Sequence, residues 1–276
     1  MAEELPYISL KGVEFGYEGA PLLFKGLSAG FDLSSTTLLC GANGAGKTSL
    51  LKLVMGILHA SRGSICVAGC NPATTPLHTM AGHIAVSPQK AEYQIFHSTV
   101  AEEIAFGPRN LSRGEVDSLV LDSMKLFALA DVQGKHPYDL HPSRRKLLSL
   151  ASAYAMDTPF MILDEPTAGL STPDKEILSS ALVRVRERKR GYILISHDLS
   201  FSLGHCERVL LLAKGEVAAN DTIREFLTRP RAEGVLKRAE TRMPGIARFS
   251  RLLGILPVAR TADEFVLSLK ERQHDH

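Results

Sequence analysis

Short apolar runs alternate along the chain with segments of helical periodicity. Runs rich in Leu, Ile and Val occupy residues 37–40, 82–86, 160–163, 192–195 and 209–212. A continuous apolar run of this length is typical of a strand that is buried on both faces of a parallel sheet. Helical patterns between the runs occupy residues 48–58, 145–156 and 179–188. This alternation predicts an α/β fold with a mainly parallel sheet.

Two segments depart from this alternation. The patterns of residues 8–15 and 26–33 predict antiparallel strands that lie beside the main sheet. From about residue 92 to residue 156 the pattern is helical throughout, and residues 116–129 form one amphipathic segment within it. We therefore expect a mixed sheet core, an antiparallel β subdomain and a helical subdomain inserted at about residues 90–156.

The chain changes character after about residue 219. The remainder is more basic and is interrupted by Pro230, Pro244 and Pro257, which predicts short helices rather than further sheet. We expect a main domain over residues 1–220 and, over residues 221–276, a C-terminal accessory region that forms a helical extension.

Composition indicates an ordinary packed protein. Of the 276 residues, 45% are hydrophobic and 22% are charged, which is a globular balance. The formal net charge is +2, from 32 basic and 30 acidic residues, so no global positive field indicates a nucleic-acid partner. The four cysteines lack the paired spacing of a zinc site or a disulfide scaffold, which predicts a reducing, cytosolic compartment; they are Cys40, Cys66, Cys70 and Cys206.

The sequence predicts no segment for export or membrane insertion. Residues 1–6 lack the basic and apolar regions of a signal peptide. The longest apolar runs are far shorter than the roughly 20 residues that a helical membrane span requires. Any membrane association is therefore expected to come through a partner.

The strongest chemical signal is a glycine-rich loop between a predicted strand and a predicted helix. It has the pattern GxxxxGKT and continues into Ser49, so the predicted nucleotide-binding residues are Gly41, Ala42, Asn43, Gly44, Ala45, Gly46, Lys47, Thr48 and Ser49. Glycines let backbone N–H groups point at phosphate oxygens, and the helix N-terminus adds partial positive charge. Lys47 is placed to neutralise the β- and γ-phosphates of ATP, and the Thr48 hydroxyl to ligate Mg²⁺. The alternative, an ordinary turn, is disfavoured by this strand and helix context.

A second predicted strand ends in two carboxylates. The apolar run at residues 160–163 is followed directly by Asp164 and Glu165. Asp164 at the strand tip can hold Mg²⁺ through water, and Glu165 can polarise an attacking water as a general base. Two acids after a strand are by themselves more often a solvated loop, but the glycine loop reverses that preference.

Three further residues suit the same chemistry. His197 follows the run at residues 192–195, and a neutral imidazole there could hydrogen-bond a γ-phosphate. Gln89 follows the run at residues 82–86 and could contact both Mg²⁺ and the attacking water. Tyr17 offers an aromatic face on which adenine could stack. Each residue alone has a more ordinary interpretation, as a structural histidine, a surface glutamine and a core aromatic.

Taken together, these residues resemble the ABC-transporter ATPases in their order and spacing. The resemblance covers nearly the whole chain and includes the block Leu163-Asp164-Glu165-Pro166-Thr167-Ala168-Gly169-Leu170. It implies a P-loop NTPase fold of ABC type that uses ATP and Mg²⁺. It also implies that Tyr17 stacks on adenine, that Glu165 is the catalytic base and that His197 is the switch histidine. Gln89 then belongs to the loop that links hydrolysis to the membrane partner.

A narrower resemblance is to the energy-coupling factor ATPases, which drive the uptake of vitamins, cobalt or nickel. It rests on residues 95–111, with Phe106-Gly107-Pro108 after the Gln loop, and on a tail similar to the C-terminal helices through which those ATPases dimerise. It implies a peripheral subunit at the cytoplasmic face of the cell membrane. The implied partners are an integral membrane scaffold protein, a substrate-binding membrane subunit and a second ATPase.

The signature segment departs from the family pattern. ABC ATPases carry Leu-Ser-Gly-Gly-Gln there, and its N–H groups close on the γ-phosphate bound by the opposite subunit. This chain has Leu140-His141-Pro142-Ser143-Arg144. Pro142 has no N–H to donate, and His141 and Arg144 add bulk. We expect Ser143 to cap the following helix, and Arg144, Arg145 and Lys146 to supply positive charge to the opposite phosphate.

A second departure is Ser171, where the family usually has an aspartate that communicates across the dimer. Both departures lie on the surface that faces a partner, whereas the glycine loop, Asp164, Glu165 and His197 are intact. This asymmetry favours a heterodimer with a second ATPase that donates a proper signature, over a homodimer with two imperfect sites. The alternative is a normally working variant in which basic residues replace the lost N–H contacts.

Two other functions compete with that of a transport ATPase. A non-transport ABC ATPase, acting in DNA repair, chromosome organisation or on the ribosome, would carry a long coiled-coil insertion or a second cassette, and the sequence has neither. A regulatory nucleotide-binding subunit is supported by the altered signature, but it has no need of Glu165 as a base. The transported solute is left open, because ATPase subunits of this family do not contact it.

Overall fold

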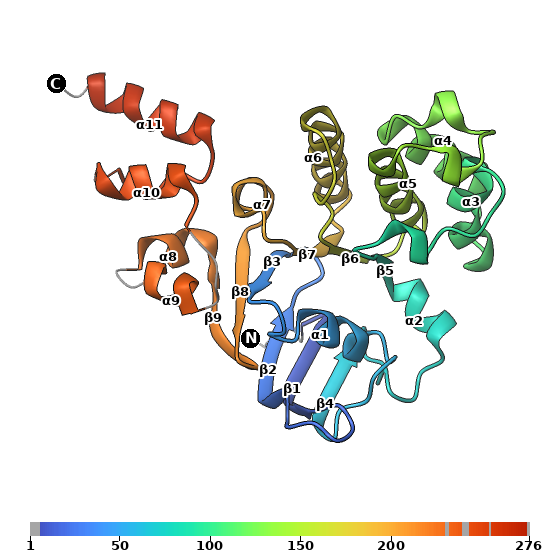
Figure 1. Cartoon of the computed structure of the whole chain (residues 1–276), viewed down its shortest axis with the longest axis horizontal. Helices are drawn as coiled ribbons and strands as arrows, with labels where there is room; N and C mark the ends of the chain where they lie inside the picture. Colours follow the sequence, from blue (N-terminus) through green and yellow to red (C-terminus); the bar gives the residue numbers. More distant parts are fainter. Residues whose placement is uncertain (1–5, 230–231, 239–242, 254, 275–276) are drawn as a thin grey trace.

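The computed structural model describes residues 6–229, 232–238, 243–253 and 255–274, and a six-stranded sheet runs through the middle of this part (Figure 1). Its strand order is β5-β6-β7-β3-β8-β9. The strands are β3 (Thr36–Gly41), β5 (Ile84–Ser87), β6 (Phe160–Asp164), β7 (Gly191–Ile195), β8 (Arg208–Ala213) and β9 (Glu216–Thr222). All neighbours are parallel except β8 and β9. The predicted α/β fold with a mainly parallel sheet is confirmed.

Apolar side chains cover both faces of this sheet. Along β7, Tyr192 and Leu194 belong to one buried apolar cluster, whereas Ile193 and Ile195 belong to the other. Successive side chains of a strand point to opposite faces. A strand that is buried on both faces therefore needs an unbroken apolar run, which is the pattern found in the sequence.

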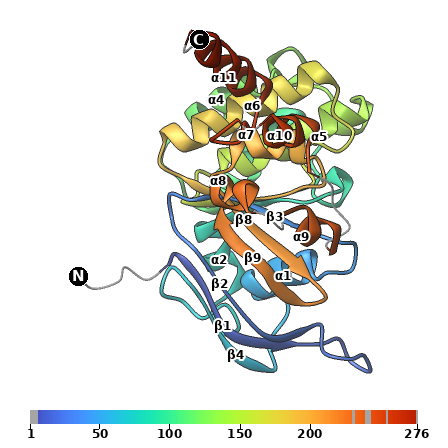
Figure 2. The ribbon, with the colours of Figure 1, turned by 90° about the vertical axis from the view of Figure 1, so that its left-hand side faces the viewer.

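A second, antiparallel sheet lies beside the first. It has the order β2-β1-β4 and consists of β1 (Ile8–Phe15), β2 (Phe24–Phe31) and β4 (Arg62–Val67). The predicted strands at residues 8–15 and 26–33 correspond to β1 and β2. Helix α1 (Lys47–Val54) packs with both sheets, since its buried leucines share one apolar cluster with residues of β1 and β2 and with residues of β3 and β7 in the main sheet. In Figure 2 the antiparallel strands lie at the bottom and helices α4–α7 at the top.

The predicted helical insertion is a group of helices at one side of the sheet (Figure 1). They are α3 (Val100–Asn110), α4 (Val116–Leu126) and α5 (Pro142–Ala155). Ile104, Met124 and Leu148 bring the three helices into one buried cluster. The other helices before the C-terminal region are α2 (Leu77–His83), α6 (Thr172–Glu187) and α7 (Leu199–His205).

The C-terminal region carries short helices on the side opposite the helical subdomain (Figure 1). They are α8 (Ile223–Thr228), α9 (Ala232–Arg238), α10 (Gly245–Leu252) and α11 (Ala262–His274). The predicted boundary at residue 220 falls within β9, which ends at Thr222. Residues 1–5 at the N-terminus, and 230, 231, 239–242, 254, 275 and 276 in the predicted accessory region, lie outside the described residues. Among the described helices, none combines the length and the apolar composition that crossing a membrane demands.

Leu194 tests the core of the central sheet. It lies on β7 and is 0% exposed. Leu194→Ala should lower the free energy of unfolding by about 2–5 kcal/mol, because the truncation loses apolar burial and leaves a cavity. The matched control is Leu121→Ala on α4, where Leu121 is 47% exposed and the change should stay within about 0.5 kcal/mol. Urea unfolding measures both variants, and equal losses would contradict this packing.

Candidate functional site

Most of the residues singled out in the sequence line one cleft of about 750 Å³. Its lining includes Tyr17, Asn43, Gly44, Gly46, Lys47, Thr48, Ser49, Gln89, Asp164, Glu165 and His197. These residues follow β1, β3, β5, β6 and β7 in the chain. The carboxyl ends of parallel strands meet at one edge of a sheet, so the strand order brings distant parts of the sequence together there. Gly41, Ala42 and Ala45 belong to the same glycine loop but do not line the cleft.

The glycine loop needs glycine at three of its positions. A Cβ on Gly41 would lie 2.3 Å from the carbonyl oxygen of Leu212. Gly44 has φ +78° and Gly46 has φ +101°, in the left-handed region that L side chains rarely adopt. A Cβ on Gly46 would lie 2.5 Å from the Phe24 ring, so no side chain fits there. Gly46 is also the N-cap of α1 and provides no side-chain hydrogen bond to the first turn. The first N–H groups of α1 are therefore available to an anion in the cleft.

Lys47 is held across the base of the loop. Its Nζ donates to the carbonyl oxygens of Gly41 at 2.6 Å and Ala42 at 3.0 Å. Burial lowers the pKa of Lys47, and the negative charges of Glu165 and Asp164 oppose that shift. The ammonium group is thus held against the glycine loop before a ligand binds. A phosphate could replace the two carbonyl groups as its hydrogen-bond partner.

Asp164 is the last residue of β6 and Glu165 follows it directly, and both line the cleft. The Glu165 N–H donates to the carbonyl of Ile195 at 2.9 Å, which anchors this turn to β7. Burial raises the pKa of both carboxyl groups; the charges of Lys146 and Lys47 oppose the shift at Asp164, and that of His197 opposes it at Glu165. A raised pKa makes a carboxylate a stronger base.

Glu165 has an unused acceptor. Its Oε1 is buried and accepts no hydrogen bond from the described residues, and the Nε2 of His197 lies 3.5 Å away. The other oxygen, Oε2, accepts from the His197 backbone N–H at 3.4 Å. One side of the carboxylate is thereby oriented while the other keeps its lone pairs, which is the arrangement that a base needs in order to accept a proton from water.

The donor set of the cleft fits Mg²⁺. Thr48 offers a hydroxyl, Asp164 a carboxylate and Gln89 an amide oxygen, and all three residues line the cleft. Mg²⁺ prefers oxygen ligands and usually takes only one or two carboxylates from the protein, with water and phosphate oxygens completing its octahedron.

Tyr17 lies at the mouth of the cleft with its ring fixed. Its hydroxyl is 2.9 Å from Ser49 Oγ, and its ring meets Phe15 edge-on at a centroid distance of 5.0 Å. The residue is 48% exposed, so part of the ring is open to a planar ligand. Sequence analysis missed the neighbouring lining residues, which are Ala20, Pro21, Leu22 and Leu23. They belong to the turn between β1 and β2, and the signal that could have found them is that this turn follows Tyr17 directly.

The signature residues His141, Pro142, Ser143 and Arg144 do not line this cleft; they form the start of α5. Pro142 is the first helical residue, and the imidazole of His141 caps the helix by accepting from the Ser143 N–H at 3.4 Å. The Ser143 hydroxyl lies 3.0 Å from the same Nδ1 atom. The expectation that Ser143 caps the helix is therefore wrong. Proline favours the first helical position, which moves the cap to the residue before it.

The basic residues that follow are directed elsewhere. Arg144 makes a bidentate pair with Asp131, at 2.9 and 3.1 Å. Lys146 is 4% exposed and points into the protein, where burial lowers its pKa to about 8. The expectation that Lys146 supplies positive charge to an opposite phosphate is therefore wrong, because its ammonium group is bound to backbone carbonyls inside the chain.

Ser171 has a local structural role. It is the N-cap of α6, and its side chain and that of Asp174 form a reciprocal capping box. Serine is among the preferred N-cap residues, because its oxygen satisfies a free N–H of the first turn.

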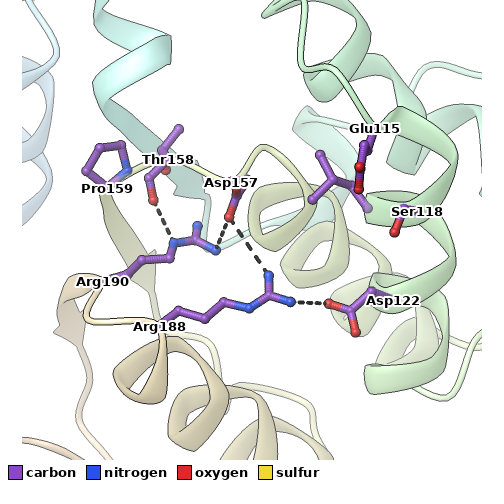
Figure 3. Close-up of a pocket in the computed structure, with 9 residues that line it drawn as sticks. Glu115, Ser118, Asp122, Asp157, Thr158, Pro159, Arg188 and Arg190 are labelled. Atoms are coloured by element: carbon purple, nitrogen blue, oxygen red, sulfur yellow. Dashed lines mark hydrogen bonds and ion pairs between the residues drawn. The ribbon is translucent and has the colours of Figure 1, made fainter.

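A second cleft, of about 640 Å³, is lined by none of the residues singled out for nucleotide chemistry (Figure 3). Arg188 lies 2.7 Å from Asp122 of α4 and 3.9 Å from Asp157, and Arg190 donates to the Thr158 carbonyl at 2.6 Å. Asp122 and Asp157 are paired with Arg188 and Arg190 here. This cleft is therefore a structural junction, in which an ionic cluster ties the helical subdomain to the loop before β6.

The fold and the cleft define an ATP-binding cassette of the P-loop class. Residues 24–168, more than half of the 276 residues, match the protein family described as ABC transporter. The chain belongs to this family, and it is an ATPase.

Relatives of known sequence agree with this assignment. A putative ABC transporter ATP-binding protein of Pyrococcus furiosus is 31% identical over 94% of this chain and 98% of its own length. The nickel import ATP-binding protein NikO of Rhodobacter capsulatus is 34% identical over 87% of this chain and 97% of its own. The energy-coupling factor transporter ATP-binding protein EcfA of Methanothermobacter thermautotrophicus is 28% identical over 97% and 86%.

Two solved structures share the fold. One is cbiO1 of Clostridium perfringens, described as part of the ABC transporter complex cbiONQ, with a TM-score of 0.74 and 21% identity over 91% of this chain and 100% of that one. The other is a dimeric ATP-binding cassette in a post-hydrolysis state with ADP and phosphate, with a TM-score of 0.72 and 19% identity over 79% of this chain and 99% of that one. Both likenesses support the ABC fold.

Tyr17 gives a test of the adenine end of the cleft. Tyr17→Ala removes the ring and should weaken ATP binding by about 10-fold, in line with base–aromatic stacking. Tyr17→Phe is the matched control, because it keeps the ring and loses only the hydroxyl contact with Ser49; its affinity should stay within about threefold of the parent. Titration with a fluorescent ATP analogue measures both variants. Equal weakening would show that the hydroxyl contact, not the ring, matters.

Proposed function

We propose that this chain is the ATP-hydrolysing subunit of a membrane importer of the energy-coupling factor type, powering uptake of a micronutrient such as a vitamin or a transition metal ion. The observation that carries the proposal is the cleft in which Lys47, Asp164 and Glu165 converge. Relatives named for nickel import and for energy coupling support the transport system.

In this proposal each part of the nucleotide has a place in the cleft. Adenine stacks on the open face of Tyr17, and the phosphates lie against the glycine loop and the N-terminus of α1. Lys47 exchanges its two carbonyl partners for phosphate oxygens, which costs little because the ammonium group is already at the loop. Thr48, Gln89 and Asp164 would hold Mg²⁺, and its charge would offset that of the phosphates.

Glu165 activates the attacking water. Its free Oε1 accepts a hydrogen bond from water, and burial makes it more basic than an exposed carboxylate. His197 is anchored through its own N–H to Oε2, and its exposed imidazole faces the place where a γ-phosphate would lie. Gln89, which lines the same cleft, would contact the water and the metal through its amide group.

An exposed aromatic patch beside the Gln loop suits the membrane scaffold protein. Tyr93, Phe96 and Phe106 are 80%, 61% and 42% exposed, and the rings of Phe96 and Phe106 pack edge-on at 4.7 Å. The buried carboxylate of Glu103 fixes this loop by accepting from the backbone N–H groups of Phe96 and His97 at 3.0 and 2.9 Å. Because the patch continues from Gln89, a partner seated there would sense the nucleotide. The chain would then lie peripherally at the cytoplasmic face of the membrane.

The second proposed partner is another ABC ATPase. The C-terminal region carries exposed apolar side chains, with Leu252, Leu256 and Leu267 exposed by 76%, 75% and 58%. An accessory region of this kind suits dimerisation through residues 221–276. We favour a heterodimer, because His141 caps α5 from within the chain and Pro142 removes an N–H, so this chain's signature offers little to an opposite phosphate.

Substitutions in the cleft test the ATPase function. In the complex with its partners, Lys47→Ala should abolish measurable ATP binding at this site. Glu165→Gln should retain binding and slow hydrolysis by about 100-fold or more, because the amide cannot accept the proton. Lys52→Ala, at an exposed basic position of α1, is the control and should behave like the parent. Parent-like turnover by the Lys47 and Glu165 variants would refute the proposed function.

Restoring the family's signature sequence tests whether the two ATP sites of the proposed dimer are unequal. The isolated chain with His141→Ser, Pro142→Gly, Ser143→Gly and Arg144→Gln should hydrolyse ATP at least about 10-fold faster than the isolated parent, because helix N–H groups regain access to an opposite phosphate. Adding Glu165→Gln should abolish the gain. The heterodimer preference fails if the isolated parent is fully active, or if the restored chain is no faster.

A further inference from the structure

Lys146 is a buried lysine that no part of the nucleotide-binding motif includes. It is 4% exposed and lies in the second turn of α5, just after the signature segment. Its Nζ donates to three backbone carbonyl oxygens, those of Pro88 at 2.8 Å, Gln89 at 3.0 Å and Asp164 at 3.2 Å. An ammonium group has three N–H donors, so all of them are used.

These three carbonyls come from the ends of two neighbouring parallel strands. Pro88 and Gln89 begin the loop after β5, whereas Asp164 ends β6. Other contacts hold later residues of the same loop, since Ser149 donates to Gln94 at 2.8 Å and Tyr138 donates to the carbonyl of Glu92 at 3.4 Å. Lys146 acts on the peptide that carries the Gln89 side chain.

Stability alone is a weak reason for this arrangement. Removing a cation from water costs free energy that its hydrogen bonds only partly recover, and an apolar side chain of similar length would avoid that cost but would leave the three carbonyl oxygens without this donor. What the ammonium group provides is directional: one atom binds the carbonyl groups of Pro88 and Gln89 together with that of Asp164, and so fixes the distance and orientation between the start of the loop and the end of β6.

We propose that Lys146 is a positioning residue of the ATPase site, which fixes the Gln89 peptide and the end of β6 so that the Gln89 amide and the Asp164 carboxylate face Mg²⁺ together. The inference rests on the metal-binding roles proposed above for Gln89 and Asp164. Helix α5, which begins at the signature segment, would then directly hold the two parts of the chain that carry Gln89 and Asp164.

The test measures nucleotide binding by the full-length chain with Mg²⁺ and with EDTA. Lys146→Met removes all three donors at nearly constant length. We expect its affinity for a fluorescent ATP analogue in EDTA to stay within about twofold of the parent, because Lys146 does not touch the glycine loop. The additional affinity that Mg²⁺ confers should fall about 10-fold, the usual scale for losing a support of a metal ligand. Amide hydrogen exchange at residues 88–95 should become faster.

The matched control is another buried cation. Arg190 is 5% exposed and donates to the backbone carbonyls of Thr158 and Tyr154. It lines the second cleft and not the one that contains the glycine loop. Arg190→Met should lower the melting temperature and leave the Mg²⁺-dependent gain unchanged. If Arg190→Met loses as much of that gain as Lys146→Met does, the effect is general destabilisation and the proposal is overturned. It is also overturned if Lys146→Met keeps the full gain.

Two further variants keep the outcome decisive. Lys146→Gln retains a polar head with two donors, so it should fold if Lys146→Met does not, and it should lose part of the additional affinity that Mg²⁺ confers.

The variant Gln89→Ala tests whether Lys146 acts through Gln89. Gln89→Ala should lose the additional affinity that Mg²⁺ confers, and adding Lys146→Met to it should cause little further loss, since residues that act through one another are not additive. If Gln89→Ala has no effect, the proposed role of Gln89 fails and the inference fails with it. If Gln89→Ala has an effect and Lys146→Met has none, only the inference fails.

Discussion

The parallel hydrogen bonding of β3, β6 and β7 is the constraint on which the ATPase site depends. It places the carboxyl ends of these strands at one edge, so that the glycine loop, Asp164 and His197 meet although more than a hundred residues separate the first from the last. The Glu165 N–H to Ile195 hydrogen bond extends this alignment one residue past the strands. These side chains therefore have fixed positions relative to one another, and a site that is arranged in advance avoids reorganisation during a reaction.

The two faces of the molecule differ in how their polar groups are used. On the cleft side, Lys47 and the Oε1 atom of Glu165 are in positions where a ligand can recruit them. At the start of α5, the groups that could serve a neighbouring subunit already have partners within the chain: His141 with Ser143, and Arg144 with Asp131. This contrast is the physical basis for expecting unequal sites in a dimer.

Much of this arrangement was predictable from sequence, for a physical reason. Buried parallel strands need continuous apolar runs, and the phosphate loop needs glycines at fixed places, so both leave strong local signals. Strands β4 and β9 were missed because their sequences are largely polar, as in Arg62-Gly63-Ser64 and Asn220-Asp221-Thr222, and their strand character depends on pairing with distant residues. The inward direction of Lys146 was missed because a Lys beside two Arg residues looks like an exposed basic face, and only helix packing decides where it points.

Phe24 shows how a residue outside the chemistry can restrict the motif. Its ring occupies the volume above Gly46, so two separate constraints act on that position, one from the backbone angle and one from the space left by β2. A smaller residue at position 24 would relax only the second constraint, the limit on space, and would leave a void beside the glycine loop. The antiparallel sheet thus packs against the glycine loop, and the choice of residue at position 24 is tied to the conformation of that loop although Phe24 carries no reactive group.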